Sequence, residues 1–324
     1  MPIPYFDAHC DTIHRCQTSG LPYRESWPEL CEYYEAAQCL RISGGHIDLE
    51  RAAGFSRYAQ VFALYQDPEL LPPGSSMEQQ GQVMYYRFLR EMEENEDRIL
   101  PCRTGRQVDE AVAAGKAAAL LSIEGADLIG CDPEQVAVAA RWGVRLLNPV
   151  WNYPNALSGT NCRDMERGLS PRGADFMRQL EAHEIYVDVS HISDPGFWDV
   201  IRLARRPVVA SHSNSRALCP HPRNLTDDMF RAIRDSGGVV GLNLYRDFVG
   251  DERMEALLRH VEHFLALDGE KTLCIGGDLD GCEALAGGME GIQDVPRLWQ
   301  ALEERGYPER LLEDIFWGNL RRIL

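Results

Sequence analysis

The chain has 324 residues, 44% of them apolar and 26% charged, so it is long enough to bury a large core. Its formal net charge of −17 at pH 7 argues against binding to a phosphate backbone, and we expect no nucleic-acid partner. No apolar run approaches the roughly 18 residues of a membrane helix, and no signal peptide is evident. We therefore expect a cytoplasmic protein without membrane contact.

Short apolar runs alternate with longer amphipathic segments along the chain. Several of the runs are almost continuously apolar, as strands buried on both faces are. The eight predicted strands cover residues 5–11, 58–65, 117–125, 144–152, 185–191, 207–213, 238–245 and 272–280. The predicted helices cover residues 77–95, 133–143, 174–184, 194–206, 226–238, 252–269, 294–307 and 308–324.

This alternation predicts an α/β fold with a parallel sheet, and eight strands is the number that closes a (β/α)8 TIM barrel. An open doubly wound sheet is the alternative, weakened because no G-x-G-x-x-G motif follows the first strand. We interpret residues 14–57 as an insertion after the first strand, with helices near the barrel mouth. No domain boundary is evident, so we expect a single domain over residues 1–324.

The cysteines give little evidence of a disulfide framework. There are ten of them, spread from Cys10 to Cys282, and none forms a C-x-x-C pair. Cysteines placed in this way are most often reduced, buried, small apolar residues. We expect most of the ten to be free thiols.

Side chains that can bind metal or carry protons fall at the ends of the predicted strands. In a TIM barrel the carboxyl ends of the strands form the active-site face. Because side chains alternate along a strand, His9 and Asp11 are expected to point one way and Cys10 the other. Imidazole and carboxylate together suit zinc and related divalent ions. The residues at these ends are His9, Asp11, Glu124, His191, His212 and Asp278.

Two other patterns favour structure over chemistry. His260 and His263 lie mid-helix among charged neighbours, which favours a solvated helix face. The Ser-His pairs at 190–191 and 211–212 hint at a serine nucleophile. Adjacent residues on a strand point to opposite faces, however, so neither pair is expected to form a Ser–His hydrogen bond.

Six motifs follow one another along the chain: HCDT (9–12), SIEGAD (122–127), DVSHISDPGFWDV (188–200), SHSNSRAL (211–218), HPRNLTDD (221–228) and GGDLDG (276–281). In this order they resemble the membrane dipeptidase (renal dipeptidase) family of metallopeptidases. The resemblance runs from residue 5 to the end of the chain. It implies an amidohydrolase-like TIM barrel with two zinc ions, or another divalent metal, that cleaves free dipeptides, including L-Xaa-D-Xaa. It also implies a homodimer, the commonest symmetric assembly.

Carried over motif by motif, the resemblance implies two kinds of site residue. The implied zinc ligands, with Glu124 bridging the two ions, are His9, Asp11, Glu124, His191 and His212. The implied catalytic residues are Asp278, as acid/base, and Glu124, and the implied substrate-binding residues are Arg223, Tyr245, Trp151 and Asn224. A hydroxide shared by the ions would attack the scissile carbonyl, and the planar fork of Arg223 matches a substrate carboxylate. A structural salt bridge is the alternative role for Arg223.

One departure from the family pattern concerns Trp151, which stands where many relatives carry a histidine after the fourth strand. Tryptophan has one N–H donor and no acceptor, so it cannot replace a protonated imidazole. Two alternatives therefore stay open: a related amidohydrolase acting on another amide, lactam or ester, and a non-catalytic relative that uses the barrel for binding. The intact ligand set argues against the non-catalytic alternative.

Overall fold

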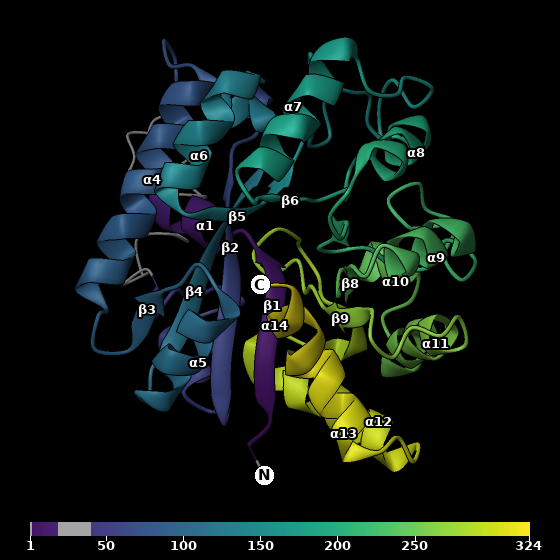
Figure 1. Cartoon of the computed structure of the whole chain (residues 1–324). Helices are drawn as coiled ribbons and strands as arrows, with labels where there is room; N and C mark the ends of the chain where they lie inside the picture. The colour runs from purple at the N-terminus through teal and green to yellow at the C-terminus, as the bar shows by residue number, and fades with distance from the viewer. Residues whose placement is uncertain (1, 19–39) are drawn as a thin grey trace.

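The computed structural model describes residues 2–18 and 40–324, and within them the strands form one parallel sheet (Figure 1). The order of strands around the sheet is β6-β5-β4-β2-β1-β9-β8-β7, and β3 pairs with β4 outside this path. The strands are β1 (Pro4–Cys10), β2 (Arg57–Tyr65), β3 (Ile99–Pro101), β4 (Ala117–Glu124), β5 (Val144–Asn148), β6 (Tyr186–Val187), β7 (Val209–Ala210), β8 (Val239–Leu242) and β9 (Leu273–Ile275).

The two ends of this path meet, which makes the sheet a barrel. Asp188, directly after β6, forms a parallel bridge with Val209 of β7. The N–H of Val189 donates to the carbonyl of Val209 at 2.7 Å. We call this contact between β6 and β7 the seam. It confirms the (β/α)8 TIM barrel and excludes the open doubly wound sheet.

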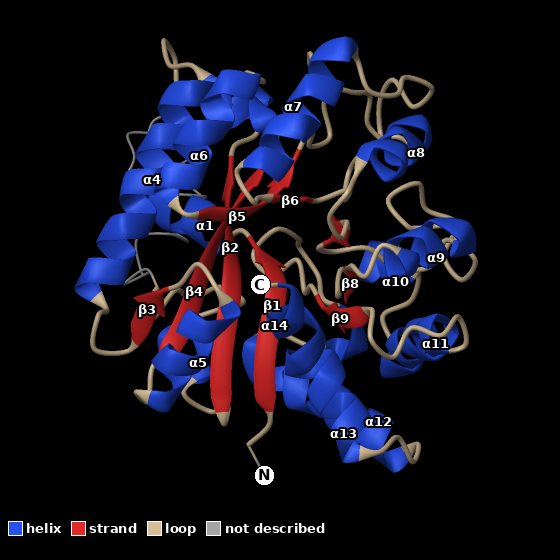
Figure 2. Cartoon of the chain, viewed as in Figure 1, coloured by secondary structure: helices blue, strands red, loops and turns tan. Residues whose placement is uncertain are grey.

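Helices surround the barrel strands, as Figure 2 shows. Serine or threonine caps several of them, as at Ser76 before α4 and Thr226 before α9, where the side chain accepts from the third helical N–H. The α-helices are α1 (Thr12–Thr18), α3 (Leu49–Ala52), α4 (Met77–Glu94), α5 (Gly105–Ala113), α6 (Val136–Trp142), α7 (Pro171–Ala182), α8 (Asp194–Leu203), α9 (Asp227–Asp235), α10 (Arg246–Val249), α11 (Met254–Leu265), α12 (Val295–Glu304), α13 (Glu309–Glu313) and α14 (Asn319–Ile323).

The strands in the second half of the barrel are shorter than the sequence predicts. Strand β6 has two residues, β7 two and β9 three, because the polar motif residues that follow them leave the extended conformation. His191, Asp278 and Asp280 all have positive φ, at 76°, 57° and 64°. Left-handed backbone is uncommon for residues other than glycine, and it turns these side chains out of the strand direction.

Other elements differ from the prediction or lie partly outside the described residues. The sequence analysis missed β3, α5 and the short α10. The terminal helix over 308–324 is divided by a π-helical turn at Asp314–Gly318. Of the predicted insertion over 14–57, α1 begins immediately after β1, α3 precedes β2, and residues 19–39 lie outside the described residues.

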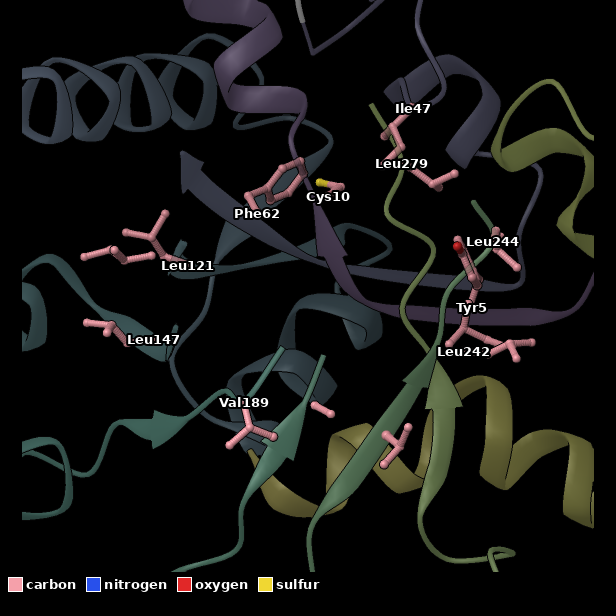
Figure 3. Packing of buried hydrophobic residues seen from close by; sticks show 14 of the residues in the cluster. Tyr5, Cys10, Ile47, Phe62, Leu121, Leu147, Val189, Leu242, Leu244 and Leu279 are labelled. Atoms are coloured by element: carbon pink, nitrogen blue, oxygen red, sulfur yellow. The ribbon is translucent and has the colours of Figure 1, made fainter. Parts of the chain in front are cut away.

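A bulge in β1 explains which of its side chains reach the site. The register with β2 shifts between Asp7 and Cys10. Strict alternation would put Tyr5 and Cys10 on opposite faces, yet both lie in one buried cluster (Figure 3), while Phe6 and Ala8 belong to another. The bulge therefore changes the direction of the side chains at the end of the strand, where His9 lies within β1 and Asp11 directly follows it.

Seven cysteines within the described residues are free, in line with the expectation that most are free thiols, and Cys16 is disulfide-bonded. No helix within residues 2–18 and 40–324 combines the length and apolar character needed to cross a bilayer.

Candidate metal centre

The six residues predicted at strand ends lie together at the carboxyl end of the barrel. His9 belongs to β1 and Glu124 ends β4, whereas the others follow β1, β6, β7 and β9. All are buried, with exposed fractions of 7% or less. The parallel barrel explains the convergence, because parallel strands all present their carboxyl ends on one face.

Glu124 stands between two sets of ligand atoms. Its Oε2 lies 3.5 Å from His9 Nε2, which is itself 3.3 Å from Asp11 Oδ2. Its Oε1 lies 2.7 Å from His191 Nε2 and 3.5 Å from His212 Nε2. Two ligand groups, His9–Asp11–Glu124 and Glu124–His191–His212, therefore share one carboxylate. One oxygen of Glu124 faces each group.

Asp278 completes the cluster from the end of β9. Its Oδ1 lies 4.0 Å from His9 Nε2. Its Oδ2 accepts a hydrogen bond from Asn243 Nδ2 at 2.9 Å. One oxygen is thus held by an amide while the other faces the candidate ligands.

The donor set fits divalent cations. Within the described residues, His9 Nε2 and Asp11 Oδ1 are buried without a hydrogen-bond partner. Buried polar atoms without partners are costly, and a coordinated cation would satisfy both of these. Imidazole nitrogen and carboxylate oxygen are ligands that zinc accepts in proteins.

Burial and neighbouring charges shift the histidine pKa values in opposite directions. At His9 burial opposes protonation, but the carboxylates of Glu124 and Asp11 outweigh it and hold the pKa well above its ordinary value. Burial, followed by the Arg223 cation, lowers the pKa of His191 well below the ordinary value. Burial, followed by His9, does the same to the pKa of His212. The His191–His212 pair is therefore neutral, with lone pairs available to a cation.

Burial also acts on the two acids of the cluster. It raises the pKa of Glu124 to about 7, and it raises the pKa of Asp278 above its usual range. The pKa of each acid is thus shifted from that of an exposed carboxyl toward neutral pH. A group whose pKa lies near the working pH can both take up and release protons.

Two supporting side chains fix the orientation of the histidines, and the sequence analysis missed both. Asn152 Oδ1 lies 2.9 Å from His191 Nδ1. Ser211 Oγ lies 2.7 Å from His212 Nδ1, so the prediction that this pair would not be hydrogen-bonded is wrong. Strand β7 ends at Ala210, and alternation does not extend beyond the strand. A proton held on each Nδ1 leaves Nε2 free to face the cluster.

A cavity of about 380 Å³ opens above these residues, within the range of small-molecule sites. The sequence analysis predicted half of its lining, namely Asp11, Glu124, Trp151, His191, Arg223, Tyr245 and Asp278, and did not predict the other half. The lining residues are Asp11, Tyr65, Glu124, Trp151, Asn152, Cys162, His191, His221, Arg223, Tyr245, Phe248, Asp278, Gly281 and Glu283.

Arg223 is the cation of this cavity. It is 3% exposed, its guanidinium lies 5.2 Å from the centroid of the Phe248 ring, and Nη2 is 3.0 Å from His191 Nε2. Its Nη1 is buried without a partner, and no carboxylate forms an ion pair with it within the described residues. These contacts favour a ligand-binding role over the structural salt bridge.

Asn224 does not line the cavity. Its Oδ1 accepts from the N–H of Asn214 at 3.2 Å, and its Nδ2 donates to the carbonyls of Cys219 and Phe248 at 3.0 and 2.8 Å. These contacts hold the loop that carries Arg223. They favour a structural role for Asn224 over the predicted contact with substrate.

An eight-stranded parallel barrel with buried histidines and carboxylates at the carboxyl ends of its strands defines a class of metal-dependent hydrolases. Residues 2–324 match the family described as membrane dipeptidase (peptidase family M19), and the chain belongs to this family. It is accordingly a metallo-dipeptidase, a hydrolase that acts on peptide bonds.

Three similar proteins illustrate the match. An uncharacterized protein in the pqqA 5′ region of Klebsiella pneumoniae is 34% identical over 240 residues, covering 70% of this chain and 88% of that protein. Dipeptidase tcpJ of Claviceps purpurea is 26% identical over 297 residues, covering 86% of this chain and 69% of tcpJ. The crystal structure of a metallo peptidase from Rhodobacter sphaeroides, liganded with a phosphinate mimic of the dipeptide L-Ala-D-Ala, is 29% identical. It covers 100% of this chain and 99% of its own, with a TM-score of 0.84.

Proposed function

We propose that this enzyme is a binuclear zinc dipeptidase that hydrolyses free dipeptides, including those of L-Xaa-D-Xaa form. The observation that carries the proposal is the position of Glu124, with one oxygen toward His9 and the other toward His191 and His212. The Rhodobacter relative, liganded with a mimic of L-Ala-D-Ala, supports the stereochemical part.

The chain's own residues suggest how each part of the reaction is served. His9, Asp11, Glu124, His191 and His212 would hold the ions, which would supply Lewis-acid chemistry by activating water and polarising the scissile carbonyl. Asp278, oriented by the Asn243 amide, would receive a proton at Oδ1 and deliver it to the leaving amine.

Arg223 would bind the substrate carboxylate through its planar fork of N–H donors. The cavity wall also includes aromatic side chains, with the ring centroids of Tyr65 and Trp151 4.8 Å apart. A charged anchor only 3.0 Å from a ligand candidate, His191, suits a short peptide whose C-terminal carboxylate lies one residue from the scissile bond. This supports dipeptides over longer substrates.

The test is a panel of L-Xaa–L-Xaa and L-Xaa–D-Xaa dipeptides, assayed with chelator-treated enzyme and with enzyme reloaded with zinc. We expect release of free amino acids only after reloading, and loss of that release in Glu124→Ala. Hydrolysis that survives either chelation or Glu124→Ala would overturn the proposal.

A related amidohydrolase activity on another amide or lactam is the second candidate, and Trp151 in the cavity wall favours it. N-acyl amino acids and lactams in the same panel separate the two. If the enzyme hydrolyses these compounds and does not hydrolyse dipeptides, the second candidate is established. Cytoplasmic location, a single domain and a homodimer stay predictions of the sequence.

A further inference from the structure

Asp188 joins the two strand ends that carry the histidine pair. Its Oδ1 accepts hydrogen bonds from the N–H of Ser190 and the N–H of Ser211, both at 3.0 Å. Ser190 immediately precedes His191, and Ser211 immediately precedes His212. Asp188 is 1% exposed, and its Oδ2 has no hydrogen-bond partner within the described residues. One carboxylate oxygen therefore fixes the backbone beside both histidines.

Asp7 makes the same pair of contacts on the other side of the cluster. Its Oδ1 accepts from the N–H of His9 at 2.9 Å and from the N–H of Gly277 at 3.0 Å. Gly277 immediately precedes Asp278. Asp7 is fully buried, and the Tyr5 hydroxyl donates to its Oδ2. In both cases a carboxylate binds the N–H two residues on and an N–H at the end of the adjacent strand.

The seam explains why Asp188 is needed there. A single bridge, between Asp188 and Val209, pairs β6 with β7. Beyond it, contacts through side chains take over, because Ser190 Oγ also accepts from the N–H of His212 at 3.3 Å. Backbone pairing alone therefore does not set the spacing of the two histidines, whose Nε2 atoms lie 3.0 Å apart.

The contact between Asp7 and the backbone of residue 277 requires a residue without a side chain, and glycine stands there. A Cβ at this position would lie 2.7 Å from Asp7 Oδ2, closer than a Cβ atom approaches another heavy atom. Glycine thus allows the Asp7 carboxylate to reach the backbone of the loop that carries Asp278. Its φ is not positive, so alanine would change this contact without straining the backbone.

We propose that Asp188 and Asp7 are positioning residues, each of which sets the geometry of one half of the metal centre. Asp188 would position the half formed by His191 and His212, and Asp7 the half formed by His9 and Asp11. Hydrogen bonds from N–H groups to a buried carboxylate are strong. Mutation of residues that hold metal ligands in place typically weakens metal affinity by about 10- to 100-fold. This inference rests on the proposed two-ion site.

The experiment measures zinc binding to chelator-treated protein by competition with a chromophoric chelator. We expect Asp188→Ala to weaken one of two binding steps by roughly 10- to 100-fold and to leave the other almost unchanged. Asp188→Asn is the matched comparison, because its remaining oxygen can still accept both N–H bonds although the charge of the carboxylate is lost. It should bind zinc more tightly at that step than Asp188→Ala does.

Gly277→Ala, which disturbs the Asp7 contact, should weaken the other binding step. Combining Asp188→Ala with His191→Ala should lower the zinc affinity of only the binding step that Asp188→Ala already weakens. Combining it with His9→Ala should lower the zinc affinity of both steps. Circular dichroism of the chelator-treated proteins controls for folding. If Asp188→Ala does not fold, Ser190→Ala, which removes a hydrogen bond at the same seam, is expected to weaken the same step.

Three results would overturn the inference: Asp188→Ala and Gly277→Ala weaken the same step, Asp188→Asn binds as poorly as Asp188→Ala, or every variant binds like the wild type. A wild type that binds fewer than two ions would instead contradict the proposed function. The two failures are therefore distinguishable.

Discussion

Trp151 forms part of the apolar wall of the cavity at the candidate site. Its ring centroid lies 4.8 Å from that of Tyr65 and 5.6 Å from that of Tyr153. It lies 6.3 Å from the ring centroid of His191, a ligand candidate. The residue thus shapes the cavity by contact rather than by proton transfer.

We expect Trp151→Ala to raise KM for dipeptides by roughly tenfold, since a buried aromatic contact contributes about 0.5–1.5 kcal/mol beyond its area. The value of kcat and the zinc content should change little, because tryptophan offers no acceptor and no ligand. Steady-state kinetics and metal analysis measure both. Trp151→Phe is the control and should retain most of the affinity, and a fall in kcat at constant KM would contradict this role.

Arg223→Lys should raise KM for dipeptides by roughly 10- to 100-fold, because lysine keeps the charge but loses the planar fork. Dipeptide amides, which lack the carboxylate, should be affected little. Arg163→Lys is a matched control: Arg163 lies 4.0 Å from the centroid of Tyr153, near the same cavity, and is half exposed. Equal losses for acids and amides would show that Arg223 does not bind the carboxylate.

The residues of the site were predictable to different degrees. Ligand candidates stand in short motifs at strand ends, so the sequence identifies them. Asn152 acts on His191 and Asn243 on Asp278 through contacts between separate loops, and single polar residues in a loop carry no such signal. Ser211 contacts its sequence neighbour His212, and it was missed because alternation was assumed to continue beyond the strand. For Asn224 the motif predicts a contact with substrate, whereas its amide binds backbone groups of the loop that carries Arg223.

Helix α11 shows what a local pattern misses at the scale of one element. His260 and His263 were predicted to lie on a solvated face, but His260 is 1% exposed. Its Nδ1 accepts from the N–H of Ser215 at 3.1 Å, and its Nε2 lies 3.1 Å from the carbonyl of Val249. The spacing from Leu257 to Phe264 places residue 260 on the buried face, so helical periodicity outweighs the charged neighbours.

His260 makes the stability of the fold depend on pH. Burial lowers its pKa from 6.5 to about 4, so the folded state holds the ring neutral while the unfolded chain takes up a proton at higher pH. The contribution of the neutral His260 ring to the free energy of unfolding is complete above about pH 6.5 and is lost as pH falls toward 4. It amounts to about 3 kcal/mol at most. Denaturant unfolding at several pH values measures it.

The comparison variant is His260→Gln. We expect it to be less stable than the wild type at pH 7 and to lose less stability between pH 6.5 and 4, because the other titrating groups are common to both proteins. Parallel pH profiles for the two proteins would contradict the assignment to His260.

At the scale of the whole molecule, the barrel was predictable because its strands are buried on both faces and read as apolar runs separated by helices. Closure was predicted from the number of strands alone, but the contact that completes it was not, since a single bridge between Asp188 and Val209 leaves no pattern in the sequence. Strand β3 was missed because its three residues are too short to show a period. Sequence patterns thus give the order of elements better than their lengths.

Metal loading should stabilise the whole protein, because the cluster buries Asp11, Glu124 and Asp278 close together and their charges repel one another. An ion that binds only the folded state adds about 2.7 kcal/mol at 100 times its dissociation constant. We expect zinc to raise the melting temperature of chelator-treated protein by several degrees, measured by calorimetry. Glu124→Gln should lose most of this increase, and an unchanged melting temperature in the wild type would contradict a metal centre here.

The seam has a consequence for the motions of the barrel. Because one backbone bridge joins β6 to β7, opening the barrel there breaks fewer hydrogen bonds than opening it between β2 and β4, which pair over seven residues. The easiest breathing motion of the fold is therefore expected to separate His191 from His212. Fast amide exchange at Val189 and slow exchange in β2 and β4 would report that motion, and the same fluctuation would set how quickly an ion held by the two histidines escapes.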